Sequence, residues 1–352
     1  MAEMNLPYGD HVPTDTVGAQ RLSVERLRQW QAMEYGLLIH YGLITYNRDR
    51  ATIRPSDFQP PGRVDTDQWC RVARDAGMTY AIWITQHSCS FCTWDTKIEG
   101  VASVMDSPMP GDIVQSFVES CHKYGLTPCF YYGQAPFTPW SGGFCRIDPH
   151  TSYAPRHVLD QTKRQIDELL TRYGPVAEFW IDGGNAYGPN GRAELYEHVT
   201  SLQPDMVFTF NGWGHDRWRT PRFHTLDGWP CDIQCLEVLL PPFGEISPWR
   251  KMTMDRTGRA LAEPVDMYIP VGCYTVMQRH HNWFYNERSV MVPDADLLGM
   301  RLICKARNAN LVLTVAPDTT SRIPDDQVAA LMRLRENYEA AKARCDAAPS
   351  AK

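Results

Sequence analysis

Short apolar runs alternate with longer amphipathic stretches from about Tyr35 to Ala341, and this alternation constrains the fold more than any other feature of the chain. Most of the apolar runs are continuous rather than alternating in polarity, which is typical of strands buried on both faces of a parallel sheet. The stretches between them carry apolar residues at the three-to-four spacing of an amphipathic helix. Repeated strand–helix units of this kind predict an α/β protein built around a parallel sheet.

Eight strands and six helices are expected along the chain. The strands are predicted at Gly36–Tyr41, Thr79–Ile84, Thr127–Tyr132, Ala177–Ile181, Met206–Phe210, Phe223–Leu226, Met267–Val271 and Leu311–Val315. The helices are predicted at Thr66–Ala76, Asp112–Lys123, His157–Arg172, Arg192–Leu202, Asp294–Arg307 and Asp325–Ala341. The sixth and seventh strands carry weaker signals, and the irregular stretch Pro230–Glu263 is expected to be an excursion over one rim. This pattern predicts a (β/α)₈ TIM-like barrel.

The barrel is expected to form a single domain. We assign it to residues 26–342, with an N-terminal arm at 1–25 and a C-terminal tail at 343–352. These flanking segments are too short for a second domain, so no C-terminal β-sandwich is expected. The oligomeric state stays open, and a homo-oligomer is compatible with the sequence.

Charge and composition exclude several classes of partner. The net charge is −6 and no basic run occurs, which argues against a nucleic-acid or anionic-membrane partner and favours a neutral substrate. No segment is apolar for long enough to suggest a signal peptide or a membrane span. Eleven scattered cysteines indicate reduced thiols and a cytoplasmic location. Cys89 with Cys92, and Cys231 with Cys235, are spaced like halves of a zinc site, but buried thiols explain them better.

Polar residues gather where the predicted strands end, and the carboxyl ends of barrel strands carry the chemistry of this fold. They are His40, Gln86, His87, Tyr131, Tyr132, Asp182, Asn211 and Asp227. Asp182 is the most informative, because a carboxylate that ends a buried strand is costly without partners and Gly183–Gly184 lets the backbone approach a ligand. The alternative interpretation is a carboxylate that caps a helix or anchors a loop.

Tryptophans also cluster near the predicted strand ends and rim loops, Trp94 and Trp180 among them. Their faces suit the C–H faces of sugars, so Trp94 is a candidate substrate contact. The alternative for each of them is that it packs a loop onto the barrel.

Several segments, taken together, resemble a known family. In chain order they are Leu38–Gly42, Ala73–Tyr80, Thr85–Ser88, Phe91–Lys97, Asp106–Pro108, Tyr131–Tyr132, Tyr173–Pro175, Trp180–Gly183 and Lys305–Leu311. Their order and spacing resemble those of the glycoside hydrolase family 29 α-L-fucosidases, from about Arg26 to Ala341. The resemblance implies a (β/α)₈ barrel and a fucosylated oligosaccharide or glycoconjugate as substrate.

The resemblance also implies roles for individual residues. Asp182 takes the position of the nucleophile, and the residues around the non-reducing sugar are His40, His87, Tyr132 and Trp180. The general acid/base of the family lies in a pattern like G-D-F-x-T-P-E, which Asp232–Glu237 followed by Pro241 matches best, so Glu237 is assigned to it. Asp227 and Glu263 are the alternatives for this role and further candidates for contact with the substrate.

Departures from the family pattern leave the sugar open. Gln86, Ser88 and Tyr41 stand where the family has lysine, histidine and tryptophan, and the loop after the first strand lacks the W-x-x-E pattern. A related glycosidase acting on a different sugar is therefore an alternative, and a catalytically inactive sugar-binding barrel is another.

The chemistry that these residues imply is hydrolysis with retention. Two carboxyl groups about 5 Å apart support a double displacement through a glycosyl-enzyme. Asp182 would attack the anomeric carbon while Glu237 protonates the departing oxygen and then activates water. No metal or organic cofactor is required. The competing interpretation is a metal-dependent hydrolase that uses His40, His87, Asp182 and the pair His280–His281.

Overall fold

The computed structural model describes residues 20–49, 52–133, 153–211, 230–241, 248–255, 259–279 and 282–347. Its central sheet has eight strands, all parallel, which are β1 Tyr35–Ile39, β2 Tyr80–Gln86, β3 Thr127–Gly133, β4 Glu178–Asp182, β5 Val207–Asn211, β6 Gln234–Glu237, β9 Val271–Val276 and β10 Asn310–Val315. The strand order is β5-β4-β3-β2-β1-β10-β9-β6. Neighbours in the chain are therefore neighbours in the sheet, as a barrel requires.

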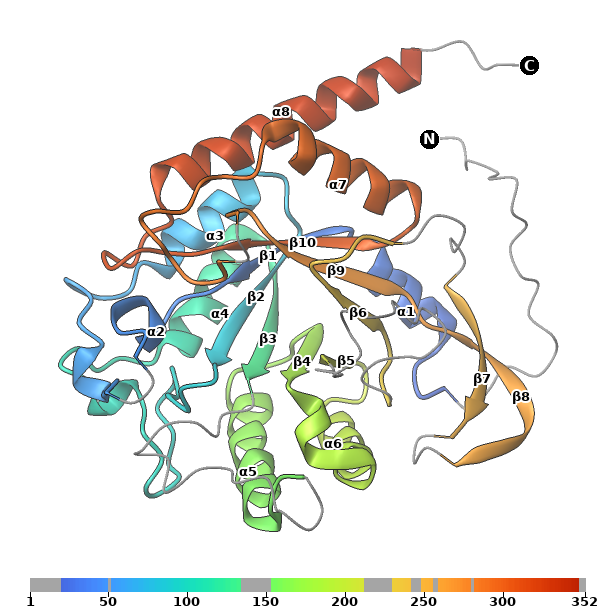
Figure 1. The fold of residues 1–352 in the computed structure, drawn as a ribbon, viewed down its shortest axis with the longest axis horizontal. Helices are drawn as coiled ribbons and strands as arrows, with labels where there is room; N and C mark the ends of the chain where they lie inside the picture. Colours follow the sequence, from blue (N-terminus) through green and yellow to red (C-terminus); the bar gives the residue numbers. More distant parts are fainter. Residues whose placement is uncertain are drawn as a thin grey trace.

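The two edge strands, β5 and β6, face each other and nearly close the barrel. Asp232 N donates to Phe208 O at 2.8 Å, and Thr209 Oγ1 donates to Ile233 O at 3.0 Å. The prediction of a (β/α)₈ TIM-like barrel is confirmed by this ring of eight parallel strands with helices around it (Figure 1).

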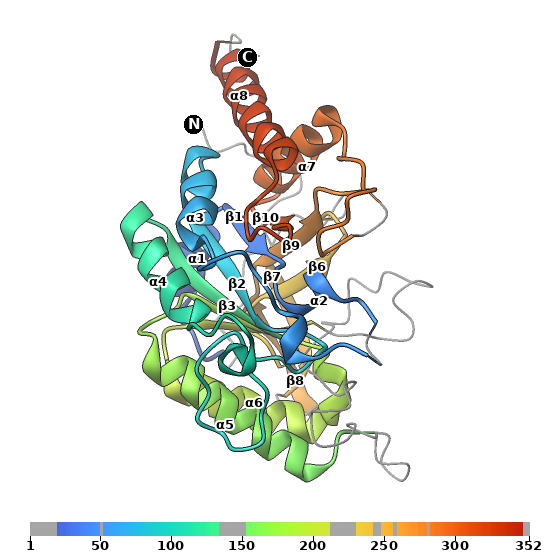
Figure 2. The same ribbon diagram turned by 90° about the vertical axis from the view of Figure 1, so that its left-hand side faces the viewer.

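Helices cover the outside of the sheet. The α-helices are α1 Val24–Gln31, α2 Leu43–Tyr46, α3 Thr66–Asp75, α4 Ile113–Tyr124, α5 Arg156–Arg172, α6 Gly188–Leu202, α7 Asp294–Ala306 and α8 Asp325–Ala347. Short 3-10 helices occur at Pro55–Asp57, Val104–Asp106 and Gly184–Tyr187. Figure 2 shows α3 and α4 along one flank, α5 and α6 together below, and α7 and α8 together above. The six helices predicted from amphipathic periodicity correspond to α3 to α8, and each of them contributes buried apolar residues to the same core as the strands.

The region after β6 departs from the prediction. The segment predicted as an excursion, Pro230–Glu263, contains barrel strand β6 and most of a hairpin made of β7 Trp249–Met254 and β8 Ala260–Tyr268. The predicted seventh strand, Met267–Val271, is wrong because it joins the end of β8 to the start of β9 across Pro270. The predicted sixth strand, 223–226, lies outside the described residues.

The amino-terminal end of the barrel is closed by α1, which ends just before β1. The Trp30 indole inserts below the sheet and donates from Nε1 to Glu178 Oε2 at 2.8 Å. Tyr274 Oη donates to Glu178 Oε1 at 2.6 Å. Glu178 is fully buried, and this burial raises the pKa of its carboxyl to about 7 although both donors oppose the shift. Buried side chains therefore fill the amino-terminal end of the barrel, and a candidate active site is expected at the opposite, carboxyl-terminal end.

Within the described ranges, no helix combines the length and the apolar character that crossing a lipid bilayer requires.

Candidate active site

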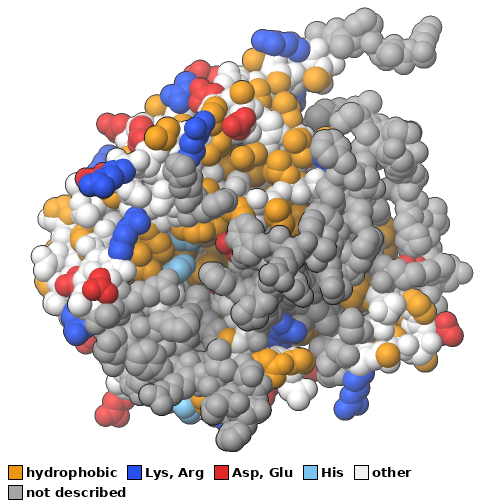
Figure 3. Space-filling model, viewed as in Figure 1, with side chains coloured by type: hydrophobic (Ala, Val, Ile, Leu, Met, Phe, Trp, Pro, Cys, Tyr) orange, Lys and Arg blue, Asp and Glu red, His pale blue; other side chains and the backbone are white. Residues whose placement is uncertain are grey.

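Six neighbouring strands bring polar side chains to one opening at the carboxyl-terminal end of the barrel. They are His40 after β1, His87 after β2, Tyr131 on β3, Asp182 at the end of β4, Asn211 at the end of β5 and Glu237 at the end of β6. Successive side chains of a strand point to opposite faces, so each strand contributes only its inward set to the opening. On the face shown in Figure 3, histidine and acidic side chains reach the surface near the centre, beside hydrophobic ones.

Asp182 is half-buried and held by three donors. Tyr131 Oη donates to Oδ2 at 2.5 Å, while Asn211 Nδ2 and Gly183 N donate to Oδ1 at 2.8 and 3.0 Å. Gly183 adopts φ 73°, a left-handed conformation that glycine adopts without a side-chain clash. The turn therefore brings its own N–H onto the carboxylate and fixes the direction of the Asp182 side chain.

Glu237 lies beside Asp182, and Asn211 bridges them. The Asn211 Nδ2 group donates to Asp182 Oδ1 and also to Glu237 Oε2. The two oxygens that accept from Asn211 Nδ2 therefore lie within about 5.3 Å of each other, the largest separation that the two hydrogen bonds allow. Carboxyl groups tied together in this way are compatible with the roughly 5–5.5 Å separation of retaining glycosidases.

The two histidines form the other side of the opening. The ring of His87 stacks on the ring of Tyr131 with centroids 5.7 Å apart. The ring of His40 lies edge-on to the ring of His87, with centroids 5.9 Å apart. Burial lowers the pKa of His40 well below its usual value, and the neighbouring His87 adds to the shift. His40 is therefore neutral near pH 7, and its buried Nδ1 has no hydrogen-bond partner within the described ranges.

A glycine allows this approach of the histidines. A Cβ atom on Gly133 would lie 2.8 Å from the Cα of His87, closer than real Cβ contacts. Glycine at this position therefore lets the backbone of His87, just after β2, pass close to the end of β3. The imidazole of His87 can then lie on the ring of Tyr131.

An aromatic wall from the segment after β9 covers the histidines. Trp283 lies 5.0 Å from the ring of His40, and Phe284 contacts His40 and His87 edge-on at 5.3 and 5.0 Å. Arg48, in the loop after β1, donates to the carbonyls of Phe284 and Tyr285. Polar groups on one side and aromatic surface on the other suit a sugar, which has hydroxyl edges and C–H faces.

The structure corrects two of the predicted sugar contacts. Tyr132 points away from the barrel axis and donates from Oη to Gln165 Oε1 on α5 at 2.6 Å. Trp94 is also on the outer side, fully buried, with Nε1 donating to Glu168 Oε2 at 2.8 Å. Both side chains pack between the sheet and α5, so neither reaches the opening.

Gln86 is turned the same way, because its side chain meets Gln165 and Cys92. The glutamine that replaces the family lysine at this position therefore alters the packing between the sheet and α5, and it does not alter the wall of the opening.

Trp180 faces inward but lies below the carboxylates. Its ring packs against Tyr131 and Tyr274 with centroids 4.9 and 4.4 Å away, and it is 2% exposed. It therefore supports Tyr131 and Asp182 from the barrel core. Glu263 is exposed on β8, whose end at Tyr268 packs near α1 at the amino-terminal end of the barrel, so the structure does not bring it to the pair. Asp227 lies outside the described residues.

Sequence reasoning gave no catalytic or substrate-binding role to four residues that the structure places at the opening, namely Tyr131, Asn211, Trp283 and Phe284, although it named Tyr131 and Asn211 among the polar strand ends. Asn211 carried a signal, since it follows the fifth strand as Asp182 ends the fourth. Tyr131 was indistinguishable from Tyr132 without knowing which face of β3 points inward.

The potential metal ligands of the described residues are scattered rather than clustered. Among the described residues, no three His, Cys, Asp or Glu side chains are arranged to hold a metal ion. The four cysteines of the two predicted half-sites, Cys89, Cys92, Cys231 and Cys235, are buried. His280 and His281, named in the metal-dependent alternative, lie outside the described residues.

Comparison with known proteins identifies the relatives of this chain. The family model described as alpha-L-fucosidase matches residues 46–257. Alpha-L-fucosidase 1 of Arabidopsis thaliana is 23% identical over 318 residues, which are 88% of this chain and 58% of that protein. The chain thus spans less than two thirds of the length of this relative.

Solved structures share the fold. A glycoside hydrolase 29 family member from an unknown rumen bacterium has a TM-score of 0.67 and 23% identity, over 90% of this chain and 56% of that one. AlfC, an alpha-L-fucosidase from Lactobacillus casei solved in complex with its alpha-L-fucose product, has a TM-score of 0.67 and 17% identity, over 91% of this chain and 99% of that one. At these identities the likeness establishes a common barrel.

Proposed function

Because the chain belongs to the α-L-fucosidase family, glycoside hydrolase family 29, we propose that it is a retaining exo-glycosidase that removes a terminal α-L-fucosyl unit from a fucosylated oligosaccharide or glycoconjugate. One observation carries this proposal. Asp182 and Glu237 are bridged by the amide of Asn211, and a double displacement requires two carboxyl groups that lie close together.

In the first step, an Asp182 oxygen attacks the anomeric carbon as the glycosidic C–O bond breaks. Glu237 gives its proton to the departing oxygen, and the product is a fucosyl ester of Asp182 with inverted configuration. Tyr131 and Gly183 hold the carboxylate for this attack, because each donates to an Asp182 oxygen. Their hydrogen bonds fix its orientation before the substrate arrives.

In the second step, water attacks the anomeric carbon of the ester and Glu237 takes the proton from that water. The ester bond breaks, Asp182 is regenerated, and two inversions give net retention. His40 contributes as a neutral imidazole, since its pKa is lowered by burial. It presents one N–H donor and one acceptor nitrogen, a combination that suits sugar hydroxyls.

Two alanine variants test the proposal. We expect Asp182→Ala to abolish turnover of an aryl α-L-fucoside and, with added azide, to release β-fucosyl azide, because azide replaces the missing nucleophile in a single inversion. Glu237→Ala should slow hydrolysis of natural glycans by about 10²–10⁴-fold. With azide and an activated aryl fucoside it should release α-fucosyl azide. Glu263→Ala, an exposed carboxylate away from the opening, is the matched control and should keep full activity.

The outcomes separate the alternatives. If Glu237→Ala keeps full activity on glycans, the acid/base assignment is wrong and Asp227 is next to be tested. If the unmodified protein binds fucose but hydrolyses no fucoside, it is a sugar-binding barrel instead.

Ser88 favours a second candidate, a related glycosidase acting on a different sugar. Its hydroxyl lies 3.1 Å from Nδ1 of His87 at a position where the family has a second imidazole. A panel of nitrophenyl glycosides measures the preference, and faster turnover of a non-fucoside would replace fucose in the assignment.

A further inference from the structure

A second depression lies on the same rim, outside the opening that holds Asp182. It is formed by the loop after β1 and the loop after β10, two paired strands whose carboxyl ends share that rim. Its volume is about 560 Å³, within the roughly 300–1,000 Å³ of small-molecule sites. The residues that line it are Tyr46, Asn47, Asp57, Gln59, Pro61, Thr319 and Thr320.

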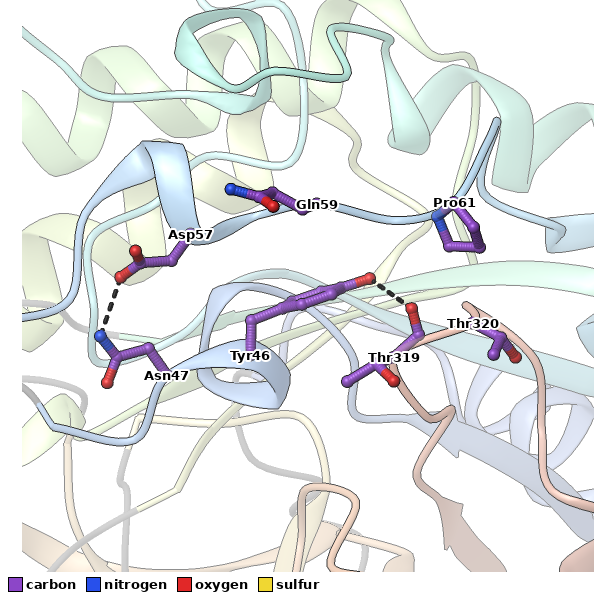
Figure 4. Close-up of a pocket in the computed structure, with 7 residues that line it drawn as sticks. All are labelled: Tyr46, Asn47, Asp57, Gln59, Pro61, Thr319 and Thr320. Atoms are coloured by element: carbon purple, nitrogen blue, oxygen red, sulfur yellow. Dashed lines mark hydrogen bonds between the residues drawn. The ribbon is translucent and has the colours of Figure 1, made fainter.

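Hydrogen bonds hold the walls of this rim pocket in place. Tyr46 lies across it, between the segment with Asp57 and Gln59 and the loop with Thr319 (Figure 4). Its hydroxyl donates to Thr319 O at 3.0 Å and pairs with the hydroxyl of Tyr41 at 2.6 Å. Asn47 Nδ2 donates to Asp57 Oδ2 at 2.8 Å. The pocket is therefore already shaped before a ligand binds, which lowers the entropic cost of binding.

The chemistry of the lining selects a class of ligand. Carboxamides, one carboxylate and two threonine hydroxyls offer donors and acceptors, while the Tyr46 ring and Pro61 offer apolar surface. The lining contains no lysine or arginine, so nothing in it attracts an anion. A sugar ring matches both kinds of surface, because its edges carry hydroxyl groups and its face carries C–H groups. We propose that the rim pocket binds a neutral sugar unit.

The loop that carries the rim pocket is connected to the opening. Arg48 follows Asn47 and donates to the carbonyls of Phe284 and Tyr285. The ring of Phe284 in turn contacts His40 and His87. The bound sugar is either a further unit of the glycan whose terminal residue reaches Asp182, which rests on the proposed function, or part of a separate chain.

A double variant removes two side chains of the lining and keeps the hydrogen bonds of Tyr46 and Asn47. Gln59 and Thr319 are exposed, the frame uses the backbone carbonyl of Thr319, and Gln59 Nε2 donates to Ser56 O of its own segment at 2.7 Å. We therefore compare Gln59→Ala/Thr319→Val with a matched control, Gln115→Ala/Thr171→Val, on the exposed faces of α4 and α5. Lactose and N-acetyllactosamine are titrated into each full-length protein by ligand-observed NMR. Hydrolysis of fucosyllactose and of 4-nitrophenyl α-L-fucoside is measured in parallel.

We expect the rim variant to bind at least one of the two disaccharides about tenfold more weakly than the control, as loss of one or two hydrogen bonds predicts. A raised KM for fucosyllactose, with kcat and turnover of the aryl fucoside unchanged, would show that the unit belongs to the same glycan. An unchanged KM with weakened disaccharide binding would show a separate chain.

The same affinities in both variants, or no binding of either disaccharide, would overturn the rim site. Disaccharide binding that depends on the rim in a protein that hydrolyses no fucoside would overturn only the proposed function.

Discussion

Replacing Asn211 by alanine tests the arrangement of the two carboxyl groups most directly. Its Nδ2 group donates to Asp182 Oδ1 and to Glu237 Oε2, so alanine removes this bridge between them. Asp182 keeps its hydrogen bonds from Tyr131 and Gly183, but the amide no longer ties Glu237 to it, so the distance between nucleophile and acid is held less firmly. Asn211 itself is buried and has no proton to exchange in the proposed reaction.

The size of the effect follows from the two hydrogen bonds. The bond to the ionised nucleophile contributes about 1.5–3 kcal/mol, and the bond to the protonated acid contributes about 0.5–1.5 kcal/mol. Their loss raises the barrier by about 2–4.5 kcal/mol, which corresponds to a decrease in kcat/KM of about 30- to 2,000-fold. We expect the decrease mainly in kcat, because the bridge holds reacting groups rather than sugar hydroxyls.

The assay is steady-state hydrolysis of 4-nitrophenyl α-L-fucoside, with Thr209→Val as control. Thr209 lies two residues before Asn211 on β5 and donates to Ile233 O without touching either carboxyl group. Unfolding in urea shows whether each variant keeps its fold. If Asn211→Ala retains kcat/KM within about threefold while Asp182→Ala is inactive, the bridge does not position the pair.

Two further predictions concern the inside of the barrel. Tyr131→Phe should lower kcat/KM by about 10- to 100-fold, because Asp182 loses a donor, whereas Tyr132→Phe should leave it within about twofold, since that hydroxyl bonds Gln165 outside the sheet; equal losses would contradict the assigned orientation. For Glu178, the folded pKa of about 7 exceeds the unfolded value of 4.5. The stability that it contributes is complete below pH 4.5 and is lost as the pH rises to about 7. The free energy of unfolding should therefore fall by on the order of 3 kcal/mol across this window, relative to Glu178→Gln. Parallel pH curves for the two proteins in urea unfolding would refute this.

Most strands could be predicted because their burial on both faces leaves a continuous apolar run. The run at Thr127–Tyr132 corresponds to β3 almost to its ends for this reason. β6 could not be found this way, since Gln234–Glu237 is short and half polar. It pairs with β9 on one side and faces β5 across the closing gap. Backbone hydrogen bonds from distant segments therefore define it, and no local pattern does.

The seventh strand shows a different limit. Met267 and Tyr268 are buried and apolar like barrel residues, but they end a hairpin strand that packs near α1. Pro270 was the signal that separates this strand from β9, because proline lacks the N–H that a central strand needs. The barrel strand begins only after it, at Val271, and includes a glycine and a threonine that weaken its apolar pattern.

The site could be predicted as a set of strand ends but not as a set of side-chain directions. Because β3 is buried on both faces, Tyr131 and Tyr132 have equivalent surroundings in the sequence, and nothing local says which points to the axis. The pairing register resolves this once one inward residue is known. Asp182 is paired with Gly133 on β3 and with Asn211 on β5. Residues paired across a parallel sheet share a face, and Tyr131 lies two positions before Gly133, so the inward direction of Asp182 also selects Tyr131 and Asn211.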